Sequence, residues 1–179
     1  MSQDQSTKIQ TPKAPQLHFD RVEDFAPLLP PMRAIAGLDF GEKTIGFAVS
    51  DLLRVVATPL LTIKRVKFTD DAARLLELIA ARNLVGLVLG LPRNMDGSEG
   101  PRAQATRAFA RNLSRLTPLP ICFWDERLST VAAERALIEA DMSRLRRKQL
   151  IDHVAAGYIL QGVLDRMAHM AKAAGGVHD

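Results

Sequence analysis

The sequence predicts an α/β domain in which a mixed five-stranded sheet carries helices on both faces. Two patterns lead to this fold class. Three strand-like segments follow one another without a helix between them, which is typical of an antiparallel meander. Strand-like and helix-like segments then alternate, which favours parallel strands joined by helices. The chain has 179 residues, enough for one such domain with an extension.

The meander is predicted from three runs of apolar and β-branched residues. Residues 34–39 form a buried strand that ends on an acid, and the turn 41–43 connects it to a second strand over 44–50. Residues 55–66 suit a third strand. Within this strand Pro59 predicts a bulge or a sheet edge, because proline has no N–H to donate to a neighbouring strand.

The remaining elements follow from hydrophobic spacing, from a fully apolar strand and from Pro101, which suits the first position of a helix. In order, they are a helix over 70–82, a strand over 85–89, a long loop over 91–100, a helix over 101–116, a strand over 121–124, a helix from Ser129 or Thr130 to Ala140, and a last helix that starts within 143–147 and runs to 172.

The two ends of the chain are expected to lie outside the folded domain. Residues 1–32 hold five of the ten prolines and are otherwise rich in Gln, Ser and Thr, so we expect a mostly disordered N-terminal extension. Its apolar stretch 25–29 is the part suited to dock on the domain surface. Residues 33–172 form the domain, and residues 173–179 form a flexible tail.

Composition limits the classes of function. Hydrophobic residues make up 47% of the chain and charged residues 25%, as in ordinary globular proteins. No apolar run approaches the roughly 20 residues that span a bilayer, and the N-terminus lacks a secretory pattern, so we expect a cytoplasmic protein. The single cysteine, Cys122, excludes an intramolecular disulfide and a multi-cysteine zinc site, and we expect it to be a small buried hydrophobe. The net charge of +4 is compatible with a polyanionic partner.

Acidic residues that could carry chemistry lie on three separate elements. Asp39 ends the first strand, the pair Asp125–Glu126 follows the last strand, and Asp152 lies on or beside the apolar face of the last helix. A carboxylate in such a place is costly unless it is paired, hydrogen-bonded or bound to a metal. The structural alternatives are a bond from Asp39 to its turn, helix capping by the pair, and an ion pair between Asp152 and Lys148.

Together these carboxylates favour a site for a hard cation. The three elements can meet at one edge of the sheet, and either acid of the 125–126 pair could face it, because adjacent residues of an extended segment point to opposite sides. Three carboxylates without a cluster of histidine or cysteine favour Mg²⁺ or Mn²⁺. Such sites activate water and stabilise the leaving oxygen in phosphodiester hydrolysis.

Two basic segments suit a phosphate-containing partner. The loop 91–102 follows a buried strand, where open α/β sheets bind ligands, and it combines backbone N–H groups with Arg93 and Arg102. The alternative is a long surface loop with a turn at 96–97. Basic residues also gather in the first turns of the last helix, where the helix dipole disfavours them and where they suit either an anion or a solvated face: Arg144, Arg146, Arg147 and Lys148.

Four segments, in this order, resemble the YqgF (RuvX) family of bacterial proteins. They are the stretch Asp39 to Asp51, the loop Leu91 to Gly97, the step Asp125 to Thr130 and the helical segment Lys148 to Ala156. They follow the family patterns D-x-G-x-K-x-I-G-x-A-x-S-D, L-P-x-x-x-D-G, D-E-R-x-[ST]-T and K-x-x-x-D-x-x-A-A, and the resemblance covers about residues 33–166. One departure is Thr44, where many members carry arginine, so that a cation near the hairpin is missing.

The resemblance implies an RNase H-like fold with a metal-dependent site. Its catalytic and metal-binding carboxylates are Asp39, an acid of the 125–126 pair, for which we choose Glu126, and Asp152, and they bind Mg²⁺ or Mn²⁺. For substrate binding we predict basic residues in and beside the four segments: Lys43, Arg93, Arg102, Arg127 and Lys148.

The family is described both as nucleases that mature the 5′ end of pre-16S rRNA and, by analogy with RuvC, as Holliday junction resolvases. We therefore expect a divalent-metal-dependent nuclease whose partner is nucleic acid, with pre-rRNA favoured over branched DNA. The ribosome or its precursors are a further candidate partner. One alternative is a non-catalytic RNA- or ribosome-binding factor that keeps the acids for structure. Another is an ATP-binding fold of the actin type, but that fold needs two such domains, and 179 residues hold one.

Overall fold

The computed structural model describes residues 17–128 and 144–176, with side chains for 17–128 and 153–176. The helix expected from Ser129 or Thr130 to Ala140 lies outside the described residues. The basic cluster at 144–148 lies in a described helix, but its side chains are beyond the described part.

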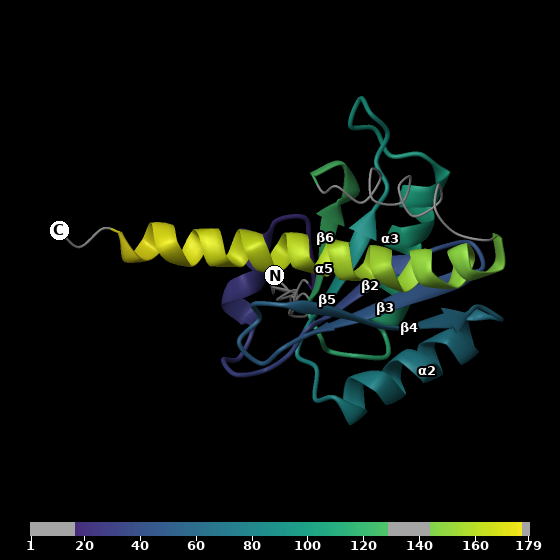
Figure 1. Cartoon of the computed structure of the whole chain (residues 1–179), viewed down its shortest axis with the longest axis horizontal. Coiled ribbons are helices and arrows are strands. Elements are labelled where there is room, and N and C mark those ends of the chain that lie inside the picture. The colour runs from purple at the N-terminus through teal and green to yellow at the C-terminus, as the bar shows by residue number, and fades with distance from the viewer. Residues whose placement is uncertain (1–16, 129–143, 177–179) are drawn as a thin grey trace, which may run out of the picture.

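Within the described residues, six strands form one sheet at the centre of the domain (Figure 1). Its order is β1-β6-β5-β2-β3-β4, and the strands are β1 His18–Phe19, β2 Ala36–Phe40, β3 Thr44–Ser50, β4 Ala57–Lys64, β5 Leu87–Leu91 and β6 Ile121–Asp125. β2, β3 and β4 pair antiparallel, whereas β5 pairs parallel with β2 and β6 pairs parallel with β5. The predicted meander and the predicted parallel strands are both confirmed, and the fold is RNase H-like. The sheet has six strands where five were predicted, because β1 adds to the edge of the sheet at β6.

Pro59 has the effect predicted from the sequence. It lies on β4, the edge strand of the sheet, opposite Ala48 of β3. The register of this pairing shifts between Phe47 and Ala48. The missing N–H is tolerated here because the strand is both an edge and irregular.

Helices cover both faces of the sheet (Figure 1). One face carries α2 (Phe68–Ala81) and α3 (Pro101–Leu113), and the other carries α5 (Arg144–Gly175). Alternating strand residues separate the two cores: Leu38 packs toward α2 and α3, whereas Gly37 lies against Leu160 of α5. Asp39, two residues beyond Gly37 on the same strand, therefore shares the α5 face. The helix continues through residues 173–175, where a flexible tail was expected.

α5 runs antiparallel to β2 and β4 across this face. Near the start of β4 the Ala57 N–H donates to Gln161 Oε1 at 2.8 Å, and near its end Thr62 Oγ1 lies 3.1 Å from His153 Nδ1. Moving forward along the strand thus means moving back along the helix. The first turns of α5 consequently lie at the end of the sheet where β2, β5 and β6 finish, and the last turns project beyond the body (Figure 1).

Residues 17–32 do not form the disordered extension expected there. After β1, which pairs parallel with β6, the chain forms the short helix α1 (Val22–Phe25) and the 3-10 turn η1 (Ala26–Leu28). Val22 and Phe25 are buried in the core beneath α5. Proline content was a poor guide because the apolar residues between the prolines bury enough surface to hold the segment in place. The stretch 25–29 docks on the domain, as expected.

Two further sequence inferences concern membranes and Cys122. None of the helices in the described part of the chain has the length and apolar character needed to cross a membrane. Cys122 is fully buried on β6, and burial raises the pKa of its thiol to about 12. The cysteine is a packing residue, as predicted.

Candidate active site

Asp39 lies at the carboxyl end of β2, and it is 6% exposed. Its cross-strand neighbour on β3 is Gly46, which places no side chain beside the carboxylate. The next residue in this row is Thr62 of β4, which contacts His153 of α5. The strand pattern thus places a buried acid on the α5 face, under the early turns of that helix.

Glu126 also lies on the α5 face of the sheet, but it comes from the β6 side of β2. β2 and β5 pair in register up to Leu38 and Leu89, so that Asp39 and Gly90 are the next residues side by side. A Cβ atom at Gly90 would lie 2.6 Å from Glu126 Oε1, so the carboxylate rests directly against this glycine. The absence of a side chain at Gly90 therefore lets Glu126 reach across β5 toward Asp39.

Asp125, the other acid of the pair, has a different partner. Arg127 donates hydrogen bonds to it from two side-chain nitrogens, Nε and Nη2, and the shortest contact is 2.7 Å between Nη2 and Oδ2. The hydrogen bonds from Arg127 are the main reason that the pKa of Asp125 is lowered. β6 ends at Asp125, and the 3-10 turn η2 (Glu126–Leu128) redirects the chain, so that the two acids face different surroundings.

Asp152 belongs to α5, but its side chain lies outside the described part of the chain. Its backbone position is set by the helix: Ala156, one turn later, packs its carbonyl against Gly37. One helical turn and two strand residues each cover about 6 Å. Because α5 and β2 run antiparallel, the turn that carries Asp152 lies at the level of Asp39.

The donors in this region suit a hard cation. Asp39 on β2 and Glu126, which follows β6 and lies against β5, offer carboxylate oxygens, and oxygen donors are what Mg²⁺ and Mn²⁺ prefer. Among the described residues, no three acidic, histidine or cysteine side chains are close enough to hold an ion. A third ligand would therefore come from the turn of α5 that carries Asp152.

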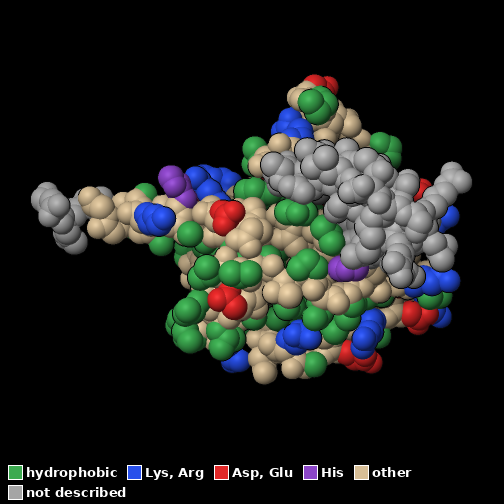
Figure 2. All heavy atoms as spheres, in the orientation of Figure 1, with side chains coloured by type: hydrophobic (Ala, Val, Ile, Leu, Met, Phe, Trp, Pro, Cys, Tyr) green, Lys and Arg blue, Asp and Glu red, His purple; other side chains and the backbone are tan. Residues whose placement is uncertain are grey.

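The β5–α3 loop, residues 92–100, projects from the body above this end of the sheet (Figures 1 and 2). Charge pairs hold its base: Glu99 accepts two hydrogen bonds of 2.7 Å from Arg107 of α3 and lies 3.4 Å from Arg93. The Arg107 guanidinium lowers the pKa of Glu99. At the tip Gly97 adopts φ 87°, a conformation that side chains disfavour.

The predicted substrate-binding residues differ in their surroundings. Lys43 and Arg102 are exposed, and no carboxylate in the described part of the chain pairs with either. Arg127 is bound to Asp125 and also donates to the Met95 carbonyl at 3.4 Å, so it ties η2 to the β5–α3 loop. The side chain of Lys148 lies outside the described part.

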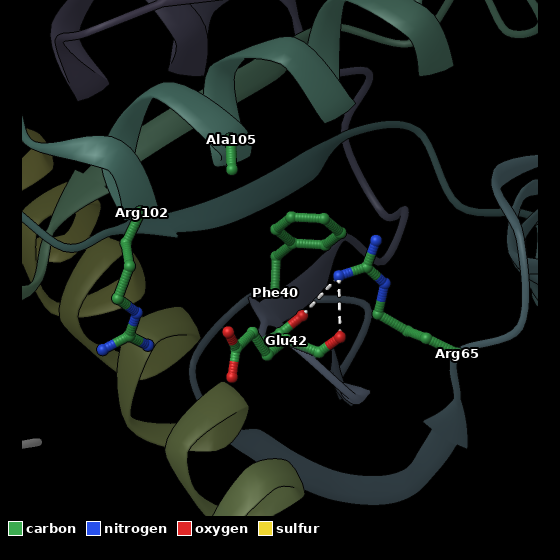
Figure 3. A pocket seen from close by; sticks show the side chains of 6 residues that line it. Phe40, Glu42, Arg65, Arg102 and Ala105 are labelled. Atoms are coloured by element: carbon green, nitrogen blue, oxygen red, sulfur yellow. Dashed lines mark hydrogen bonds between the residues drawn. The ribbon is translucent and has the colours of Figure 1, made fainter.

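Arg102 lines a shallow hollow beside the β2–β3 turn (Figure 3). On its far wall the Arg65 guanidinium lies 4.2 Å from the centre of the Phe40 ring and donates to the carbonyls of Gly41 at 2.7 Å and Glu42 at 3.1 Å. Phe40 packs toward α2 and α3, so the sheet separates this hollow from the carboxylate of Asp39. Arg65 fixes the turn that follows Asp39.

Sequence reasoning missed Glu99, Arg107 and Arg65. Each is a charged residue of ordinary context whose partner is brought to it by folding. One signal was present: Arg107 shares a face of α3 with the buried residues Ala103 and Ala110, and a cation in such a place needs a partner.

This fold, with a buried carboxylate at the end of its central strand and a second beside it, defines the class of the protein: an RNase H-like nuclease domain. The family model RuvX, described as Holliday junction resolvase, matches residues 33–166. The chain belongs to this family.

Curated relatives of the chain carry the name "Putative pre-16S rRNA nuclease". One from Ruegeria sp. (strain TM1040) is 73% identical over 151 residues, which cover 84% of this chain and 96% of the relative. Another, from Paracoccus denitrificans (strain Pd 1222), is 70% identical over 153 residues, which cover 86% and 97%.

Among solved structures, the chain is similar to Thermus thermophilus RuvC in complex with a Holliday junction substrate. The identity is 14% and the TM-score 0.49, over 76% of this chain and 96% of that chain. It is also similar to the yeast mitochondrial Holliday junction resolvase Ydc2, with 13% identity and a TM-score of 0.49 over 79% and 82%.

Proposed function

We propose that this protein uses Mg²⁺ or Mn²⁺ to hydrolyse a phosphodiester bond at the 5′ end of pre-16S rRNA in the cytoplasm. The observation that supports the proposal is the placement of two acids at the carboxyl edge of the sheet: Asp39 lies on β2, and the Glu126 carboxylate rests against Gly90 of β5, the strand next to β2. The choice of RNA follows from the relatives, which are about 70% identical over most of their length and are named for that substrate.

In this proposal some residues of the chain bind the metal and others bind the phosphates of the substrate. Asp39, Glu126 and Asp152 would hold the cation, and Asp39 is the rigid member because it sits within a central strand. A bound Mg²⁺ or Mn²⁺ supplies an activated water and stabilises the leaving oxygen. The exposed cations Lys43 and Arg102 would contact phosphates of the RNA on either side of the bond that is cleaved.

The assay compares the wild-type chain with Asp39→Asn on a precursor RNA that carries a 5′ extension, in Mn²⁺ and in EDTA. We expect the variant to lose cleavage by orders of magnitude. Its melting temperature without metal should be equal to or higher than that of the wild type, because clustered carboxylates repel one another when no cation neutralises them. A variant that is destabilised but cleaves at the wild-type rate would show that Asp39 is structural.

A four-way DNA junction is the second substrate in the same assay, since the family model is described as Holliday junction resolvase. Faster cleavage of the junction than of the RNA would move the activity to branched DNA. Binding of the RNA without metal-dependent cleavage would instead mark an RNA-binding factor. Sequencing of rRNA 5′ ends after depletion of the protein tests the same assignment in cells.

A further inference from the structure

Arg93, next to the candidate active site, has a guanidinium group whose hydrogen-bond donors are not all used. It follows the end of β5 by two residues, and its side chain is 28% exposed. Its Nε atom is buried without a hydrogen-bond partner, and in the described part of the chain its one charge pair is the 3.4 Å contact with Glu99. Because its one charge pair is loose, the exposed part of this guanidinium is suited to receive a phosphate.

The contact between Arg93 and Glu99 stays loose because Glu99 has a stronger partner. Arg107 binds both oxygens of Glu99 at 2.7 Å, and the oxygen it shares with Arg93 is Oε1. This two-point geometry is the favourable one for arginine and a carboxylate. Glu99 can therefore orient Arg93 without taking up its donors.

Arg107 is itself fixed from two further sides. Its Nη2 donates to Asp20 Oδ1 at 2.8 Å, and its guanidinium lies 4.7 Å from the centre of the Phe123 ring. Asp20 follows β1, so the N-terminal segment contributes a carboxylate to the base of the loop. Asp20, Arg107, Glu99 and Arg93 therefore form a chain of charges whose two middle members, Arg107 and Glu99, are each held on more than one side.

We propose that the Glu99–Arg107 pair is a positioning device that presents Arg93 to a phosphate of the nucleic-acid substrate. Glu99 and Arg107 are positioning residues and touch no substrate, whereas Arg93 makes the contact. This inference rests on the proposed function, because it assigns substrate contact at the same site.

The test is a double-mutant cycle between Arg93→Ala and Arg107→Lys. Lysine keeps the charge of Arg107 but cannot bind both oxygens of Glu99. We measure kcat/KM on the precursor RNA and the salt dependence of RNA binding. In the wild-type background Arg93→Ala should lower kcat/KM about tenfold or more, as expected for a charge-assisted hydrogen bond, and should reduce the log–log salt slope by about 0.7.

In the Arg107→Lys background the same Arg93→Ala change should have little further effect, less than about threefold, because Arg93 is already misplaced. Additive effects of the two substitutions would overturn the inference. The matched control is Arg111→Lys, an exposed position one turn further along α3, in which Arg93→Ala should retain its full effect.

Glu99→Gln provides a second route if Arg107→Lys lowers stability too far. Removal of a negative charge near the substrate should by simple electrostatics tighten RNA binding, whereas a positioning role predicts a higher KM and a lower salt slope. Tighter binding would therefore contradict the inference. Failure of the proposed function is a separate result, since it appears as absent metal-dependent cleavage by the wild-type chain itself.

Discussion

Asp125 and Glu126 are adjacent acids that the fold separates completely. Asp125 is the last residue of β6, pairs in register with Leu91, and is neutralised by Arg127. Glu126 is the first residue after the strand, and its carboxylate rests against Gly90 on the α5 face. The two side chains therefore have different surroundings: Asp125 is bound by Arg127 of η2, whereas Glu126 lies on the face where we propose the metal site.

At this scale we predict opposite results for Asp125→Asn and Glu126→Gln. Asp125→Asn should keep metal-dependent cleavage within about tenfold, while Glu126→Gln should lose more than about a hundredfold, beyond the usual cost of changing a residue that only orients a metal ligand. Asp125→Asn should lower stability at neutral pH, because it removes the ion pair with Arg127. Cleavage assays and urea unfolding measure the two effects.

The pH dependence of the stability difference between the wild type and Asp125→Asn tests whether the Asp125–Arg127 ion pair causes it. Arg127 lowers the pKa of Asp125 below its ordinary value of 3.8. The stabilisation is therefore fully present above the unfolded-state pKa and is lost as the pH falls through the lower folded-state pKa. A difference between wild type and Asp125→Asn that stays constant down to acid pH would mean that the ion pair is not its source.

At the scale of elements, the docking of α5 on the sheet determines where the site forms. The helix packs so closely on β2 that a Cβ atom at Gly37 would lie 2.6 Å from Leu160 Cβ and 2.8 Å from the Ala156 carbonyl oxygen. α5 also packs closely on β4, since a Cβ atom at Gly157 would lie 2.9 Å from Pro59 Cγ. This close approach brings the turn that carries Asp152 to the level of Asp39.

Gly37→Ala should therefore destabilise the protein by about 1–3 kcal/mol, the usual cost of overpacking a core. The atoms that the added Cβ would meet are helix backbone atoms and the Leu160 Cβ, which cannot move without shifting α5. Urea unfolding measures the change, and metal-dependent cleavage should fall with it. Gly100→Ala is the matched control, since its Cβ atom would meet only Asn94 at 3.5 Å; an equal loss of stability in both variants would contradict this account.

At the scale of the whole molecule, the N-terminal segment completes the domain. It adds β1 to the edge of the sheet at β6, which covers an otherwise unpaired strand edge. Phe25 and Leu29 pack on Gly86, just before β5, where a Cβ atom would come within 2.9 Å of the Phe25 ring. Through Asp20 the same segment also contacts Arg107 of α3, which in turn binds Glu99 at the base of the β5–α3 loop.

Phe25→Ala should consequently cost about 3–5 kcal/mol, as expected for a fully buried aromatic side chain. Leu28→Ala, three residues further along, is the control: Leu28 is 52% exposed, and its loss should change stability by no more than about 0.5 kcal/mol. Thermal or urea unfolding of both variants decides the matter. A Phe25→Ala variant as stable as the wild type would show that the segment is dispensable.

Local sequence patterns were enough to predict the strands and helices over residues 34–128, the antiparallel meander, the parallel strands, and the acids near the ends of β2 and β6. These features could be predicted because apolar runs, turn residues and Pro59 act on residues that are close to them along the chain. Folding set the different surroundings of the two acids at 125 and 126, because the Glu126 carboxylate rests against Gly90 of another strand. It also decided the sixth strand and the pairing of Glu99 with Arg107, since both form between segments that only folding brings together.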